Sequence, residues 1–421
     1  MKILVFGSGG RDHAFVHNLS ESPRVEKLYC APGNAGISAL AECVPIAATD
    51  ISALVDFAKK EQIDLTVIGM DDPLMLGVVD AFEEAGLRVF GPRKEAAILE
   101  GSKAFSKNLM KKYKIPTADF WEFSSSEEAE SFLKSHKKYP IVLKADGLAL
   151  GKGVLICENE AEALAGVREI MVDKKFGAAG NTLVIEEFLV GPEVSVLSFC
   201  DGKTVVPMVS AQDHKRALDH DQGLNTGGMG TFSPSRHYTA EHAEYAMKHI
   251  FQPTVEAMAK EGRTFRGIIF FGLMLTEDGP KVLEYNARFG DPETQVVLPR
   301  LKGDLVDIFE ACIDGTLDRQ TIEWKEDAAV CVVLASGGYP LQYKKGYPIS
   351  GLDAFSDRED LMIYHAGTAF NDKGEIVTNG GRVLGLTALS PTLDEAIAKA
   401  YANIDRISFQ DCFYRHDIGQ K

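Results

Sequence analysis

The sequence opens with MKILVFGSGGRDHA (residues 1–14), a short apolar run that ends in a cluster of glycines. The run 2–6 predicts a β-strand, and similar runs follow at 27–30, 65–68 and 88–90. Segments with the helical period lie between them, at 11–20, 51–60 and 74–85. This alternation predicts an α/β domain with a doubly wound parallel sheet over residues 1–102.

The rest of the chain predicts two further domains of mixed α/β and α+β type. A Lys-rich helix at 102–113 leads into a small α+β unit at about 118–190, within a domain that spans 103–327. In that domain we expect strands at 141–144, 154–157, 183–187, 193–200, 204–209, 267–275 and 281–286, and helices near 160–172, 239–261 and 302–314. The tail, 328–421, predicts a β-rich α+β domain with a final helix near 393–407.

Composition limits the classes of protein to which the chain can belong. Its 421 residues are 45% hydrophobic and 25% charged, as in globular proteins, and the net charge of −16 disfavours binding to nucleic acid or to anionic membranes. The seven cysteines form no Cys-x-x-Cys pair and favour a reducing compartment. Because neither a signal peptide nor a membrane span is evident, we expect a cytoplasmic protein. We also expect a monomer.

The first glycine cluster, at 7–10, follows a strand and opens a helix, so its N–H groups could bind an anion. Asp12 breaks the dinucleotide pattern G-x-G-x-x-G, which disfavours a nicotinamide cofactor. Arg11 could grip a phosphate, or it could be a solvated side chain in a tight turn. Asn34 and Asp71 follow the next two strands and therefore lie at the same edge of the predicted sheet, where ligands of α/β proteins bind.

The second glycine cluster lies in KADGLALGKGV (144–154), between two predicted strands. Such a turn can close over a triphosphate while Lys144 binds the α and β phosphates, although a flexible hairpin would look similar. The segment EEFLVGPE (186–193) places an apolar wall between carboxylates, which suits adenine and ribose.

The segment EYNARFGDPE (284–293) carries the clearest metal signal. The strand period places Glu284, Asn286 and Arg288 on one face. A carboxylate and an amide oxygen are ligands that suit Mg²⁺, whereas a polar strand end is the alternative interpretation. Two further segments, QDHKR (212–216) and NTGGMG (225–230), supply a basic cluster and a loop with exposed backbone.

In this order the motifs resemble those of the glycinamide ribonucleotide synthetase family, in the ATP-grasp superfamily. The resemblance covers nearly the whole chain: GSGGRDHA (7–14), PGN (32–34), the segments quoted above, EYNARFGDPETQ (284–295), LASGGYP (334–340) and GGRVLGLTAL (380–389). The chain departs from the family pattern at Asp12 and Asp71, where Glu is usual. The resemblance implies an N-terminal pre-ATP-grasp domain, an ATP-grasp domain with a lid at about 118–190, and a C-terminal domain.

The resemblance also implies an activity. ATP would convert glycine to glycyl phosphate, which 5-phosphoribosylamine would attack to give glycinamide ribonucleotide, ADP and phosphate in purine biosynthesis. The resemblance assigns the binding of ATP to Lys103, Lys144, Gly151, Lys152, Gly153, Glu186, Glu187, Leu189 and Glu193. It assigns Mg²⁺ or Mn²⁺ to Glu284 and Asn286, and catalysis to Arg288, Lys215 and Asp213. Phosphoribosylamine would contact Gly9, Gly10, Arg11, Asn34 and Asp71. Asn225, Thr226, Gly227, Gly228 and Met229 would also bind substrate, by closing the glycine and phosphate side.

Two other functions remain open on the sequence. One is an ATP-grasp ligase or carboxylase that acts on a different carboxylate, which the 7–14, 212–216 and 225–230 segments disfavour. The other is a sensor that binds ATP without turnover, which the intact set of Glu284, Asn286 and Arg288 disfavours.

Overall fold

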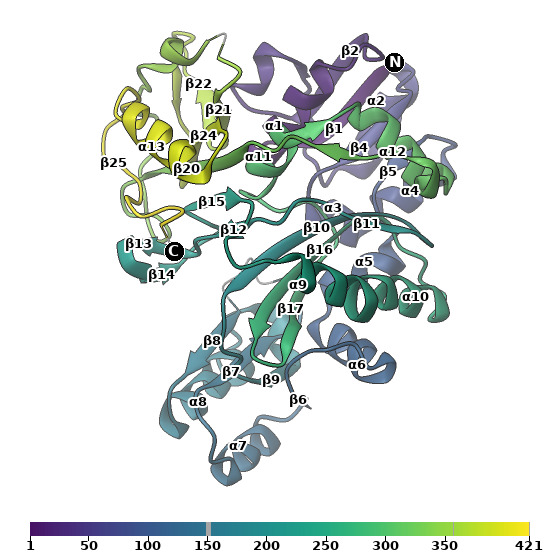
Figure 1. The fold of residues 1–421 in the computed structure, drawn as a ribbon, viewed down its shortest axis with the longest axis vertical. Coiled ribbons are helices and arrows are strands. Elements are labelled where there is room, and N and C mark those ends of the chain that lie inside the picture. Colours follow the sequence, from purple (N-terminus) through teal and green to yellow (C-terminus); the bar gives the residue numbers. More distant parts are fainter. Residues whose placement is uncertain (149–152, 357, 421) are drawn as a thin grey trace.

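The computed structural model describes residues 1–148, 153–356 and 358–420. The N-terminal sheet lies at one end of the molecule and a small α+β unit at the other, with an antiparallel sheet between them (Figure 1). The C-terminal sheet lies beside the N-terminal one (Figure 1). Within the described residues, no helix combines the length and apolar character needed to cross a membrane. All seven cysteines are described, and each is a free thiol.

The N-terminal sheet confirms the predicted doubly wound fold, because its five strands are parallel in the order β3-β2-β1-β4-β5. The strands are β1 Lys2–Gly7, β2 Lys27–Pro32, β3 Glu42–Cys43, β4 Leu65–Ile68 and β5 Val89–Phe90. The helices are α1 Gly10–Ser20, α2 Ile51–Glu61, α3 Asp71–Leu76, α4 Val78–Glu84 and α5 Lys94–Gly101. The single helix expected at 74–85 is wrong, since Gly77 (φ 91°) adopts a left-handed conformation that separates α3 from α4.

The small α+β unit is an antiparallel sheet of order β6-β9-β7-β8, with helices packed on it. Its elements, after helix α6 Lys103–Tyr113, are β6 Phe120–Phe123, α7 Ser126–Ser135, β7 Ile141–Ala145, β8 Val154–Cys157, α8 Glu160–Val167, a π-helical turn Arg168–Val172, a 3-10 turn Gly177–Asn181 and β9 Leu183–Glu187. The sequence interpretation missed β6 and α7. The short β6 is an edge strand with no fully buried residue, so it carries little hydrophobic signal.

The middle sheet is antiparallel, in the order β11-β10-β16-β17. Its strands are β10 Glu193–Asp201, β11 Val205–Pro207, β16 Arg266–Thr276 and β17 Gly279–Asn286. The helices near it are α9 Ala240–Ala246, α10 Gln252–Lys260, α11 Thr294–Val297 and α12 Leu305–Asp314, and a two-stranded piece pairs β18 Leu301–Lys302 with β19 Glu323–Trp324. The helix expected at 239–261 is α9 and α10, joined by a π-helical turn at Met247–Phe251.

The C-terminal sheet has the order β12-β15-β20-β24-β21, with β25 paired to β20. Its strands are β12 Gln212–Asp213, β15 Gly230–Ser233, β20 Ala328–Ser336, β21 Leu361–His365, β24 Arg382–Ser390 and β25 Cys412–Phe413, and helix α13 Leu393–Ile404 packs on it. Two separate two-stranded pieces pair β13 Arg216–Leu218 with β14 Gln222–Asn225 and β22 Thr368–Phe370 with β23 Ile376–Thr378. Strands β12 and β15 precede this region in the sequence, yet β15 pairs with β20 from Gly230 to Ser233. The glycine-rich loop at 225–230 is therefore fixed to the C-terminal sheet.

An aromatic cluster joins the N-terminal sheet to the middle of the chain. Phe90 of β5 stacks on Phe309 of α12 with ring centroids 4.0 Å apart, and Phe15 of α1 meets Phe289 edge-on at 4.7 Å. Phe15, Phe289 and Phe309 are at most 1% exposed. Because Phe289 follows β17, this cluster fixes the end of that strand against the N-terminal sheet.

We expect Phe309→Ala to lower the free energy of unfolding by about 3–5 kcal/mol, because it removes a buried ring and leaves a cavity. Urea unfolding followed by far-UV circular dichroism measures this change. Phe370→Ala is the control, since Phe370 is 53% exposed and its removal opens no cavity. Equal stability of the two variants would contradict the role given to the cluster.

Candidate functional site

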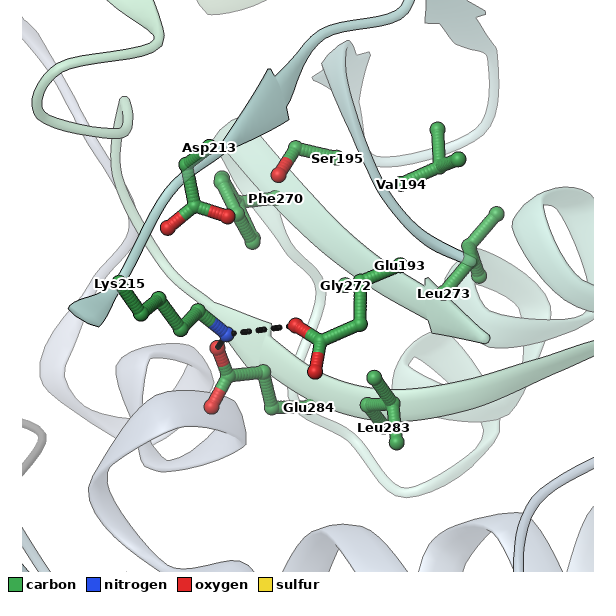
Figure 2. Close-up of a pocket in the computed structure, with 10 residues that line it drawn as sticks. All are labelled: Glu193, Val194, Ser195, Asp213, Lys215, Phe270, Gly272, Leu273, Leu283 and Glu284. Atoms are coloured by element: carbon green, nitrogen blue, oxygen red, sulfur yellow. Dashed lines mark hydrogen bonds and ion pairs between the residues drawn. The ribbon is translucent and has the colours of Figure 1, made fainter. Parts of the chain in front are cut away.

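A cleft opens on the middle sheet, where charged side chains from three strands and one loop converge (Figure 2). Lys215 reaches between two carboxylates: its Nζ lies 3.0 Å from Oε2 of Glu193 and 3.7 Å from Oε1 of Glu284. The register places Gly272 of β16 beside Glu284 of β17. A Cβ at residue 272 would lie 3.0 Å from Cγ of Glu284, so glycine leaves that side chain room to cross the strand.

The charged side chains of this cleft shift one another's pKa values. Burial alone would raise the pKa of Glu284, but the surrounding cations, Lys215 foremost, hold it below its usual value. The carboxylate of Glu193 is the main reason why the pKa of Lys215 lies well above its usual value. Burial raises the pKa of Asp213 to about 7, with Lys215 opposing the shift and Glu293 reinforcing it. Asp213 is therefore the group of the cleft that can exchange a proton near neutral pH.

The segment after Glu284 has the alternation that the sequence predicts. Residues 284, 286 and 288 are partly exposed, whereas 285, 287 and 289 are buried. A guanidinium nitrogen of Arg288 lies 3.3 Å from Oδ1 of Asn286, 2.9 Å from Oε1 of Glu100 and 3.9 Å from Oδ2 of Asp71. Glu100, at the end of α5, also accepts a hydrogen bond from the backbone of Ala287 at 2.7 Å. Glu100 was not among the predicted residues, because it lies in no motif.

The metal assignment can be tested against these oxygen donors. Among the described residues, no group of three or more His, Cys, Asp or Glu is placed to hold a metal by itself. Glu284 and Asn286 do bring a carboxylate and an amide oxygen to one strand face. Mg²⁺ takes a few protein oxygens and shares its remaining positions with phosphate and water, so the pair fits such an ion.

Three lysines and one buried carboxylate lie where the small α+β unit meets the middle sheet. Lys103 donates to the carbonyl of Gly147 at 2.9 Å, and burial lowers its pKa. Lys144 of β7 lies 2.9 Å from Oε1 of Glu186 and donates to the carbonyl of Leu283 at 3.2 Å. The other carboxylate oxygen of Glu186 pairs with Lys107 at 2.8 Å. Sequence reasoning missed Lys107, which lies on α6 outside every motif.

The remaining residues predicted to bind ATP have different surroundings. Gly151 and Lys152 lie outside the described residues, and the carbonyl of Gly153 accepts from the backbone N–H of Ala145 at 2.9 Å. Glu187 is exposed. Leu189 is 7% exposed and packs with Ala118, Met274 and Leu283 in a small apolar cluster.

The first glycine cluster is occupied by the chain's own carboxylates. Oδ2 of Asp12 accepts from the backbone of Ser8 and Gly9 at 2.9 and 2.8 Å, and Asp291 accepts from the backbone of Arg11 at 3.4 Å. The guanidinium of Arg11 is buried and donates to Asp12 and to the carbonyl of Phe289. Neither sequence interpretation of Arg11 describes this arrangement, in which the helix terminus is already neutralised.

Asn34 shapes the neighbouring loop. Its Nδ2 donates to the carbonyls of Ser8 and His365 at 2.9 and 2.8 Å, and its Oδ1 accepts from the backbone of Gly36 and Ile37. Because His365 ends β21, these contacts tie the N-terminal edge to the C-terminal sheet.

The 225–230 loop folds back on the cleft. The hydroxyl of Thr226 donates to the carbonyl of Lys215 and accepts from the backbone of Gly228, while Asn225 is exposed and the side chain of Met229 is fully buried. Arg382 of β24 donates to the carbonyl of Gly227 at 2.7 Å and pairs with Asp291 at 3.4 Å. Arg382 was not assigned a role from the sequence. The structure thus places residues from all three parts of the chain at one site.

Comparison with known families covers most of the chain. Residues 1–100 match the N domain of phosphoribosylglycinamide synthetase, residues 101–294 its ATP-grasp (A) domain, and residues 329–421 its C domain. A protein of Caldanaerobacter subterraneus subsp. tengcongensis named phosphoribosylamine–glycine ligase is 50% identical over 418 residues, which is 99% of each chain.

Solved structures show the same relationship. The crystal structure of phosphoribosylamine–glycine ligase from Thermotoga maritima has a TM-score of 0.87 and 34% identity, with all of both chains covered. The biotin carboxylase domain of 2-oxoglutarate carboxylase from Hydrogenobacter thermophilus, solved with ADP and magnesium, has a TM-score of 0.74 and 18% identity, covering 98% of this chain and 91% of that one. The second likeness concerns the fold alone.

We expect Asp12→Ala to lower the free energy of unfolding by about 3–5 kcal/mol, because it leaves the buried guanidinium of Arg11 without its carboxylate. The same unfolding measurement detects this loss. Asp56→Ala, at an exposed position of α2, is the control and should change stability little. If Asp12→Ala were as stable as the control, the loop would not depend on this carboxylate.

Proposed function

Because this chain belongs to the phosphoribosylglycinamide synthetase family, we propose that it joins glycine to 5-phosphoribosylamine, with cleavage of ATP to ADP and phosphate. The product is glycinamide ribonucleotide, an intermediate of de novo purine biosynthesis. The chain works as a cytoplasmic enzyme and as a monomer in this proposal. Its partners are the three small substrates.

One observation carries the assignment of the reacting centre: Glu284 and Asn286 share a strand face with Arg288, beside Lys215, Lys144 and Lys103. Oxygen donors surrounded by cations complement a triphosphate. The ATP-grasp family uses ATP with a divalent metal. Here Glu284 and Asn286 would hold Mg²⁺ or Mn²⁺, which supplies neutralisation of the phosphate charge.

The chemistry follows from the weak electrophilicity of a carboxylate. A carboxylate oxygen of glycine attacks the γ-phosphorus of ATP and ADP leaves. The amine of phosphoribosylamine then attacks the carbonyl carbon of glycyl phosphate, and phosphate departs with that glycine oxygen. Arg288 and Lys215 stabilise the transferred phosphoryl group by charge. Lys103, Lys144 and the glycine turn to Gly153 hold the ATP phosphates. Glu186 and Leu189 would meet adenine through their backbone, Glu187 borders the same site, and Glu193 would take the ribose hydroxyls.

The attacking amine must lose a proton, and Asp213 is suited to accept it. Its carboxyl group, with the pKa raised to about 7, is partly ionised at neutral pH. Phosphoribosylamine would lie between the first glycine cluster and the 225–229 loop. Carboxylates neutralise the N-terminus of α1, so in this proposal the sugar of the substrate faces Gly9, Gly10 and Asp71. Arg11 and Asn34 shape the loops at this edge. The phosphate of the substrate faces the 225–229 loop, beside Arg382.

The activity is tested by incubating the protein with MgATP, radiolabelled glycine and freshly generated phosphoribosylamine. We expect label in an anionic amide, formed in the same amount as ADP and absent when any substrate is omitted. Transfer of label to a different amine, with none to phosphoribosylamine, would indicate another ligase of the superfamily. Binding of ATP without turnover under every condition would indicate a sensor.

We expect Glu284→Ala to reduce product formation by about 10²–10³-fold, because a ligand for the phosphate-bound metal and a partner of Lys215 are lost. Glu277→Ala is the matched control, since Glu277 is exposed at the turn of the same β16–β17 hairpin. Wild-type turnover of Glu284→Ala would refute the metal assignment.

For Asp213→Asn we expect kcat/KM to fall by about 10²–10⁴-fold and to lose its dependence on a group that titrates at about pH 7. In the wild type, kcat/KM should rise as pH increases through that value, because the ionised carboxylate is the active form. Asp278→Asn, at an exposed turn position, should keep the wild-type profile. An unchanged profile in Asp213→Asn would assign the proton to another group.

A further inference from the structure

Lys107 is a buried cation that the reaction described above does not use. Its side chain is 3% exposed, and its Nζ donates to Oγ1 of Thr117 at 2.8 Å and pairs with Oε2 of Glu186, also at 2.8 Å. We propose that Lys107 is a positioning residue for the nucleotide: it orients Glu186, and through Glu186 it fixes the Lys144 ammonium that meets the phosphates. The proposal rests on the proposed function, which gives Lys144 its role.

The three side chains form a row of alternating charges, with the carboxylate of Glu186 between the ammonium groups of Lys107 and Lys144. Each oxygen of Glu186 faces one ammonium group, Lys107 on one side and Lys144, at 2.9 Å, on the other. Both lysines and Glu186 are buried, so a lost partner is not readily replaced by water. With Lys107 absent, Glu186 would keep Lys144 as its one cation and would be free to rotate toward it, so that only the hydrogen bond to the carbonyl of Leu283 would still hold Lys144 in its present direction.

Lys107 also connects the small α+β unit, which carries Lys144, to strand β17, which carries Glu284. Thr117, its second partner, donates to the carbonyl of Val282 on β17 at 2.7 Å. Lys107 therefore joins α6 to β9 of the small α+β unit and, through Thr117, to the strand that carries Glu284. A residue in this position can align Lys144 with the metal-binding face without contacting ATP.

Protonation gives this role a measurable signature. Burial lowers the pKa of Lys107 to about 8, against the opposing effect of Glu186 and Asp119 and with the help of Lys144. The ring of Phe120 lies 5.9 Å from its Nζ, and Lys111 reaches the same ring from the solvent side of α6. As pH rises through about 8, Lys107 loses its charge, and affinity for the nucleotide phosphates should fall.

The test measures ADP and adenosine affinity by isothermal titration calorimetry on the full chain. We expect Lys107→Met to weaken ADP binding at least about tenfold, the loss typical of a charge-assisted hydrogen bond, and to change adenosine binding less than about twofold. Lys111→Met, an exposed lysine of the same helix, should bind both as the wild type does. Wild-type ADP affinity should fall as pH rises through about 8, and this fall should be absent in Lys107→Met.

A second variant keeps the proposal testable if Lys107→Met does not fold. Lys107→Arg keeps a cation that stays charged, so ADP affinity should be independent of pH at about 8. Equal ADP affinity in Lys107→Met and Lys111→Met would overturn the proposal, and so would parallel losses for ADP and adenosine or a flat wild-type profile. Because binding is measured without turnover, a wild type that binds ADP but makes no glycinamide ribonucleotide would refute the proposed function alone.

Discussion

An ion pair between the partly exposed Arg288 and the buried Glu100 fixes the segment after β17, the strand that carries Glu284 and Asn286, against α5. One oxygen of Glu100 pairs with Arg288 at 2.9 Å, and the other accepts from the backbone of Ala287 at 2.7 Å. Glu100 thus holds both the side chain and the main chain of the segment after β17. Breaking such a pair leaves an uncompensated buried charge, so the segment has little freedom to move away.

Ion pairs of this kind explain how a protein with a net charge of −16 can bind a triphosphate. Three cations of the site are each held against a carboxylate: Arg288 on Glu100, Lys215 on Glu193, and Lys144 on Glu186. They are fixed before the ligand arrives, and little reorganisation is needed at the moment of reaction. The global field is unfavourable to an anion, but the local arrangement of charges is complementary to one.

Local patterns of the sequence predicted much of the secondary structure, although they missed β6 and α7 and merged α3 with α4. They could not predict which residues meet across the fold. The period of two along Glu284, Asn286 and Arg288 is a property of the strand itself, and the structure has it. The partners Glu100, Lys107 and Arg382 lie outside any local motif and become neighbours of the site only through the fold. Gly77 could interrupt a helix or be tolerated in it, and only tertiary context decides. The division of the chain at 102–103 and 327–328 stays a prediction.

The first glycine cluster shows a different limit. A glycine turn before a helix predicts free N–H groups, but Asp12 three residues after Gly9 turns back onto them. Capping by a residue at that position is a local possibility that the sequence allows, while burial of Arg11 against Phe289 requires the whole fold. The N–H groups of this turn are therefore paired with carboxylates of the protein itself, and the cation of Arg382 lies beside the turn, on Asp291.

We propose that these side chains position the substrates and neutralise the phosphate charge, and that the nucleophile toward ATP is the carboxylate of glycine. The direct test uses glycine labelled with oxygen-18 in its carboxylate, together with MgATP and phosphoribosylamine, and mass spectrometry of the released phosphate. We expect one labelled oxygen in each phosphate, carried over from glycine through glycyl phosphate. Unlabelled phosphate formed together with the amide would contradict this account, because ATP cleavage would then not have passed through glycine.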